Sequence, residues 1–107
     1  MAFHVLDLTV DTVRELRPLH AELRRRDPRL ARQLRDAASS IALNLGEGNR
    51  RTGKDRTQLW RVAAGSAEEV RTALRVAQAW GDLDERRLAE ALGRIDRILR
   101  ILWKLTS

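Results

Sequence analysis

Few residues in this sequence have side chains suited to catalysis. His4 and His20 lie far apart, without a second histidine at the helical spacing that builds a metal site. Cysteine is absent, which excludes thiol chemistry, disulfides and cysteine-ligated metals. The run from Gly48 to Lys54 holds glycines and cations, but it connects two predicted helices, whereas a phosphate-binding loop follows a strand. We therefore expect no catalytic residue, no metal site and no cofactor, and interpret the protein as a non-enzyme.

Arginine is the residue type that suggests a binding function. The chain has 21 basic and 15 acidic residues, a formal charge of +6, and its only lysines are Lys54 and Lys104. Guanidinium groups bind phosphate through paired hydrogen bonds and stack on bases, so the excess favours nucleic acid as a partner. Codon usage in a GC-rich genome would explain the ratio of arginine to lysine equally well.

The candidate nucleic-acid-binding residues flank two predicted turns. Those at the first turn are Arg24, Arg25, Arg26, Arg29 and Arg32, and those at the second are Arg50, Arg51, Lys54 and Arg56. Consecutive turns of an up-down bundle lie at opposite ends, so we expect two separate clusters. Contacts to phosphates carry no base information, and the sequence therefore predicts binding to RNA or DNA with weak sequence selectivity.

A polar stripe runs beside small residues in the segment from Gln33 to Gly48, and a second small-residue run spans Ala63 to Ala67. We interpret these two runs as the facing sides of an antiparallel helix pair. Six residues are expected to form a buried polar network: Arg35, Ser40, Asn44, Glu47, Ser66 and Glu69. The antiparallel register places Arg35 level with Glu69, as a possible ion pair. We favour a network that fixes helix register over a functional site.

The length of 107 residues suits one domain, with 43% hydrophobic residues to form its core. Two prolines and the helical periodicity indicate an all-α fold. The sequence lacks an apolar run long enough for a transmembrane helix and lacks a signal-peptide pattern, so we expect a cytoplasmic protein without membrane contact.

The expected helices span residues 9–26, 28–50, 53–80 and 84–105, after a lead-in at residues 1–8. Pro18 should kink the first helix, and Asp27 followed by Pro28 should begin the second. Glycine–asparagine at 48–49 should end the second helix in a left-handed cap, and Gly81 should end the third. Capping boxes are expected at Thr52 with Asp55 and at Asp82 with Glu85.

The last two turns of the fourth helix are apolar around most of their circumference. Such a helix is buried on more than one side. One interpretation is a subunit interface formed by Ile98, Ile101 and Trp103. The alternative, which the sequence leaves open, is that the segment from Phe3 to Leu8 covers the surplus apolar surface.

Two motifs carry a resemblance to a known family. Ser40-Ile41, Asn44 and Glu47-Gly48 follow an SI-x-x-N-x-x-EG pattern, and Gly65-Ser66 with Glu69 follows GS-x-x-E. The chain resembles the "four helix bundle protein" family. This family includes proteins encoded in intervening sequences of bacterial large-subunit ribosomal RNA genes and the accessory variability protein of diversity-generating retroelements.

The resemblance implies an antiparallel up-down four-helix bundle that assembles into a ring-like homopentamer. It also implies a reverse transcriptase as partner, with the bundle helping to hold its RNA template. We therefore expect a non-catalytic basic adaptor that binds nucleic acid, a nucleic-acid enzyme, or both. The alternative is a purely structural homo-oligomer of the ribosomal RNA intervening-sequence type, without direct nucleic-acid binding.

Overall fold

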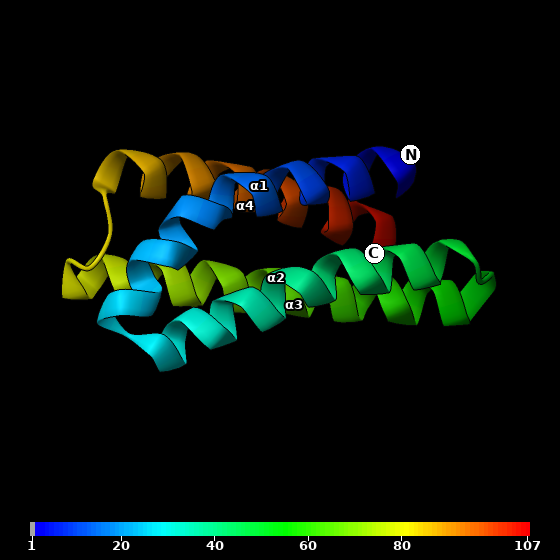
Figure 1. Ribbon diagram of the computed structural model, residues 1–107. Helices are drawn as coiled ribbons and strands as arrows, with labels where there is room; N and C mark the ends of the chain where they lie inside the picture. The colour runs from blue at the N-terminus through cyan, green and yellow to red at the C-terminus, as the bar shows by residue number, and fades with distance from the viewer. Residues whose placement is uncertain (1) are drawn as a thin grey trace.

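Helices account for nearly the whole chain. The computed structural model describes residues 2–107, with side chains from His4 onward. The helices are α1 (Ala2–Arg26), α2 (Pro28–Asn49), α3 (Gly53–Trp80) and α4 (Glu85–Thr106), and residues 2–107 contain no strand. Each helix packs on the next one, and α4 packs back on α1, which gives an antiparallel up-down bundle (Figure 1). The predicted all-α four-helix bundle is confirmed.

The core consists of aliphatic side chains whose size differs between the helix pairs. On α2 and α3 many buried positions are alanine, which lets these two helices approach closely and makes them the most extensively packed pair. On α1 and α4 the buried positions are mainly leucine and isoleucine, which fill the space between the layers. The fully buried large side chains include Leu19, Leu23, Leu34, Ile41, Leu45, Leu74, Leu88, Ile95 and Leu102.

The first helix begins earlier than the sequence predicts. It starts at Ala2, where a non-helical lead-in to Thr9 was expected. Val5, Thr9 and Thr12 are buried, and each threonine hydroxyl donates to the carbonyl four residues earlier at 2.7 Å. These bonds satisfy both hydroxyls, so threonine can occupy the core face and the helix extends toward the N-terminus.

This first part of α1 lies beside the C-terminal part of α4 (Figure 1). Val5 is fully buried, and Leu6 and Leu8 pack against the core. The alternative in which the N-terminal segment covers the apolar end of α4 is thereby supported. The side chain of Phe3, which belonged to that prediction, lies outside the described residues.

Pro18 lies inside α1. Figure 1 shows α1 bending partway along its length, so that its second half descends toward α2. Proline lacks the backbone N–H and crowds the preceding turn, which accounts for the bend. A pocket lies between this part of α1 and α2.

The helix starts depend on aspartate side chains. Asp27 accepts from the Leu30 amide at 3.1 Å, as predicted. Asp84 accepts from the Arg87 amide at 3.0 Å, so it takes the capping role that the sequence assigned to Asp82. Thr52 precedes α3 but makes no side-chain capping bond, and the predicted box with Asp55 is not formed.

The helix ends differ from each other. Gly81 ends α3 in the left-handed conformation, with φ 74°, as predicted. The predicted left-handed cap at Gly48 and Asn49 is wrong, because α2 continues through both residues and Arg50 caps it with φ −90°. Among residues 2–107, no helix combines the length and the apolar character needed to cross a membrane.

Candidate functional site

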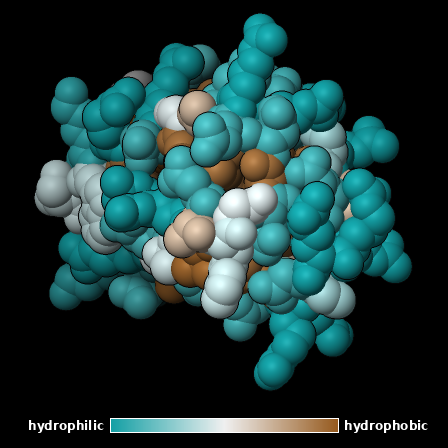
Figure 2. Space-filling view, turned by 90° about the vertical axis from the view of Figure 1, so that its left-hand side faces the viewer, coloured by the Kyte–Doolittle hydropathy of each residue, from teal (hydrophilic) through white to brown (hydrophobic). Residues whose placement is uncertain are grey.

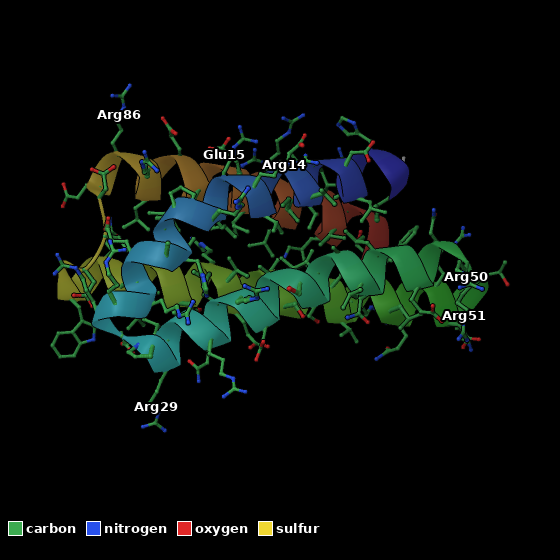
Figure 3. The ribbon with its side chains drawn as sticks, viewed as in Figure 1. Arg14, Glu15, Arg29, Arg50, Arg51 and Arg86 are labelled. Atoms are coloured by element: carbon green, nitrogen blue, oxygen red, sulfur yellow. The ribbon has the colours of Figure 1, made fainter. Side chains whose placement is uncertain are left out.

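The bundle presents two ends of different composition. We call the end with the α1–α2 and α3–α4 connections the α1–α2 end, and the one with the connection at residues 50–52 the α2–α3 end. Arg29 and Arg86 project from the first, and Arg50 and Arg51 from the second (Figure 3). The expectation that the two basic clusters lie at opposite ends is confirmed.

The basic cluster at the α1–α2 end is exposed to solvent. It consists of the exposed residues Arg24, Arg25, Arg26, Arg29 and Arg32. Within residues 4–107 the ion pairs are formed by other arginines, so none of these five guanidinium groups has a carboxylate partner. Exposed Arg86 and Arg87, in the first turn of α4, add positive charge to the same end.

Three carboxylates at the same end are bound to backbone amides. Asp27 and Asp84 cap helices, and Glu22 of α1 accepts from the Asp84 amide at 3.0 Å. The last of these bonds ties α1 to the α3–α4 connection. These acids therefore stabilise the fold locally, while the arginine side chains around them project into water.

An exposed aromatic ring accompanies this cluster. Trp80, the last residue of α3, is 74% exposed. Figure 2 looks onto the α1–α2 end and shows hydrophilic side chains around a small apolar centre. Trp80 is not among the site residues predicted from the sequence. Its position directly before Gly81, where the helix stops and burial ends, is the signal that could have identified it.

The cluster at the α2–α3 end is partly engaged in the fold. Arg51 pairs with Glu47 at 2.8 Å. Arg56 is half-buried and donates to the carbonyls of Gly48 and Asn49 at 3.3 and 3.5 Å, where α2 ends without intrahelical partners. Arg56 therefore has a structural role at the end of α2, and its contact with nucleic acid stays a prediction. Arg50 and Lys54 remain exposed.

Arg56 also lies over the ring of Trp60, with its guanidinium carbon 5.4 Å from the ring centroid. Trp60 is 8% exposed, and its indole N–H has no hydrogen-bond partner among residues 4–107. A base could not stack on this covered ring. A β-carbon built on Gly48 would lie 2.6 Å from Trp60 Nε1, so the glycine is needed for the close approach of the indole.

The predicted polar network is smaller than expected. The Ser40 and Ser66 hydroxyls lie 2.7 Å apart and join α2 to α3. Asn44 Nδ2 donates to the Ser40 carbonyl at 2.9 Å and to its hydroxyl at 3.1 Å. Glu47 binds Arg51 on the surface, outside this network. Ser40, Asn44 and Ser66 therefore form a partly buried link that fits the antiparallel register.

The expected pair of Arg35 with Glu69 is not formed. Arg35 lines a pocket between α1 and α2, whereas Glu69 lies across from Gln33 and Asp36 at the seam between α2 and α3. Both side chains are exposed. The helix register places the two residues at the same height along the bundle, but they lie on opposite sides of α2.

The residues expected at a subunit interface also need correction. Ile98 is fully buried in the chain's own core, and Ile101 packs partly buried against that core. Ile98 therefore has no surface to offer a second subunit. Trp103 is 49% exposed. Other exposed apolar side chains lie on the neighbouring helices α2 and α3, among them Leu43 (71%) and Val62 (42%).

No group of three or more histidine or carboxylate side chains within residues 4–107 is placed to hold a metal ion. His4 is exposed. His20 lines the pocket between α1 and α2, where burial lowers its pKa and the nearby Arg35 and Arg24 guanidinium groups lower that pKa further.

Comparisons with known proteins agree with this architecture. The profile of the family described as "23S rRNA-intervening sequence protein" matches residues 3–104. A search of curated proteins finds no match. The fold is similar to that of a protein of unknown function from the S23 ribosomal protein family of Bacteroides thetaiotaomicron VPI-5482. The TM-score is 0.84, and the 17% identity extends over 96% of this chain and 98% of that one. From the family match, the chain belongs to the 23S rRNA-intervening sequence protein family.

Proposed function

We propose that this protein is a non-catalytic, nucleic-acid-binding adaptor. The observation that carries the proposal is the α1–α2 end, where five exposed arginines without carboxylate partners surround the connection between two helices. Guanidinium groups suit phosphate oxygens, and such contacts hold a nucleic-acid backbone without reading bases. We expect weakly sequence-selective binding of RNA or DNA.

Trp80 makes single strands the favoured form. Its ring is 74% exposed at the same end, and an exposed ring stacks on unpaired bases of any identity. A duplex keeps its bases stacked on one another and offers the ring nothing comparable. On this proposal the basic cluster binds the backbone and Trp80 contacts one base.

The test is a filter-binding titration of a generic single-stranded RNA, its DNA counterpart and a duplex, across a salt series. Replacing Arg24, Arg25 and Arg26 with glutamine should reduce the log–log salt slope by about 2 for single strands, because three phosphate contacts are lost. Trp80→Ala should weaken single-strand binding by about 1–3 kcal/mol and leave duplex binding nearly unchanged.

A matched control removes the same charge from ion-paired positions. Arg14, Arg71 and Arg94 pair with Asp11, Asp96 and Glu15, and replacing them with glutamine should change the slope much less. Equal effects of the two triple variants would mean that only net charge matters. Absence of binding at low salt, where attraction is strongest, would overturn the proposal.

We also propose that the adaptor acts as a homo-oligomer, with the pentameric ring implied by the family resemblance. Leu43 of α2 and Val62 of α3 support a contact between copies. Both side chains are apolar and exposed, and burying them against a second copy would remove apolar surface from water. A reverse transcriptase would then meet the particle through a shared template. If the particle assembles but binds no nucleic acid, the structural homo-oligomer becomes the better account.

A further inference from the structure

A pocket of about 300 Å³ lies between α1 and α2, and none of the five arginines of the exposed cluster lines it. Its apolar floor is formed by Val13, Leu16, Leu34 and Ala38, and its polar lining by Arg17, His20, Arg35 and Ser39. Cationic or potentially cationic side chains from both helices therefore meet over an apolar surface. Carboxylates are absent from this lining.

The absence of carboxylates follows from how charge is distributed on α1. Two acidic residues of α1 face away from the pocket, because Glu15 lies 3.9 Å from Arg94 of α4 and Glu22 binds the Asp84 amide. Arg17 and His20 lie on the opposite side, toward α2. The carboxylates that could neutralise the pocket are thus turned away from it.

His20 reports the electrostatic character of the pocket. Its pKa is lowered by burial, by Arg35 on α2 and by Arg24 on α1. The two guanidinium groups, which disfavour an imidazolium, would favour an anion placed beside them, whereas burial disfavours a charge of either sign. Within residues 4–107, neither Arg17 nor Arg35 takes part in an ion pair, so both are available to such an anion.

We propose that this pocket binds a small amphipathic anion, with a carboxylate or phosphate head group between Arg17 and Arg35 and an apolar body on the floor. Guanidinium groups match both head groups through paired hydrogen bonds. The volume lies at the lower end of small-molecule sites and suits a single ring or a short acyl chain. The site does not depend on the nucleic-acid proposal, because none of the five exposed arginines at the α1–α2 end lines it.

Calorimetry and amide chemical-shift mapping with four probes test the proposal. Hexanoate and phenyl phosphate separate the two head groups, hexanamide removes the charge, and inorganic phosphate removes the apolar body. At least one amphipathic anion should bind, with shifts centred on the residues of the floor, and the two truncated probes should bind about tenfold or more weakly. Equal binding of inorganic phosphate, or shifts confined to the α1–α2 end, would overturn the proposal.

Variants locate the site. Arg35→Gln should weaken binding of the amphipathic probe about tenfold, because one charged partner is lost. Arg32→Gln is the matched control on the same helix, since Arg32 is exposed and does not line the pocket. Ala38→Leu should fill the floor and abolish binding, with thermal unfolding measured to confirm that the variant folds. An equal loss for Arg32→Gln would contradict a defined site.

The response to pH distinguishes this site from a nonspecific charge effect. Burial, Arg35 of α2 and Arg24 of its own helix oppose the protonation of His20, and Arg17 lines the same pocket. A bound anion would favour the imidazolium, so hexanoate affinity should rise as the pH falls from roughly 8 to 6, and saturating hexanoate should raise the His20 pKa measured by NMR. His20→Gln should remove this dependence. An unchanged His20 pKa in saturated protein would refute the assignment.

Discussion

A β-carbon built on Gly48 would lie 2.6 Å from Nε1 and 2.7 Å from Cδ1 of Trp60. The indole is 8% exposed and covered by Arg56, so it has little room to move away. Glycine at this position therefore serves close packing between α2 and α3. Its conformation is ordinary helix, which shows that its conformational freedom is not what the fold requires.

Gly48→Ala should destabilise the protein by about 1–3 kcal/mol, because the added methyl group forces the indole out of its position. Gly46→Ala provides the control two residues earlier. A β-carbon there meets nothing within 4 Å, so the change should stabilise the helix by about 0.5–1 kcal/mol. Chemical denaturation of both variants gives the two values. The same sign for both would show that the contact with Trp60 is unimportant.

The residues around Gly48 also show where sequence reasoning stops. Glycine before asparagine at the end of a helical pattern favours a left-handed cap, and nothing local to the sequence reveals an indole arriving from α3. In the sequence, Arg56 is one of several neighbouring basic residues, and only the structure shows that it donates to carbonyls at the end of α2. Ser40, Asn44 and Ser66 were identified correctly, because small residues at helical spacing in two segments define which faces meet.

At the scale of the helices, the strength of a cap depends on a bond that the sequence pattern suggests but does not guarantee. Asp27 accepts from the Leu30 amide at 3.1 Å, and Pro28 follows it in the first turn. Thr52 stands at the corresponding position before α3, with an extended backbone, but its hydroxyl makes no capping bond. The two positions therefore allow a direct comparison.

Asp27→Ala should lower the free energy of unfolding by about 1 kcal/mol, the usual effect of losing a capping bond. Thr52→Ala should lower it by much less, because its side chain has no such bond to lose. Thermal unfolding followed by circular dichroism measures both. A larger effect at Thr52 would indicate that its cap forms in solution.

The start of α1 could not be predicted because its core face contains two threonines. Thr9 and Thr12 break the apolar pattern in the sequence, and their hydroxyls become compatible with burial only through bonds to helix carbonyls. The side of α1 that faces α2 was equally hard to foresee. Arg17 and Arg35 come from different helices, and the bend at Pro18 decides how closely those helices approach.

At the scale of the molecule, the fold was predictable because four long periodic segments joined by short connections have few ways to pack. The end-to-end separation of the two basic clusters follows from the same topology. The topology did not predict which surface could contact a second copy of the chain. The N-terminal part of α1 lies against the C-terminal part of α4, and exposed large apolar side chains occur on all four helices, with Leu43 of α2 and Trp80 of α3 the most exposed.

The proposed homo-oligomer predicts that light scattering gives a mass several times the 12.2 kDa of one chain. Leu43→Glu should reduce that mass, because Leu43 is 71% exposed and a buried charge at an interface is unfavourable. Asp7→Lys, an exposed site on the first half of α1, is a control for a charge change. A monomer in the unmodified protein would contradict assembly, and an unchanged mass in Leu43→Glu would exclude α2 as the contact surface.

The placement of the aromatic residues along α3 gives this protein a built-in optical readout. Tyrosine is absent, so near-ultraviolet emission comes from three tryptophans. Trp60 near the start of α3 is buried and should emit at short wavelength, whereas Trp80 at its end is exposed and open to quenching by iodide. With Trp103 replaced by phenylalanine, a shift of the Trp60 emission to longer wavelength would report opening of the core. In the same unlabelled sample, protection of Trp80 from iodide would report a ligand bound at the α1–α2 end.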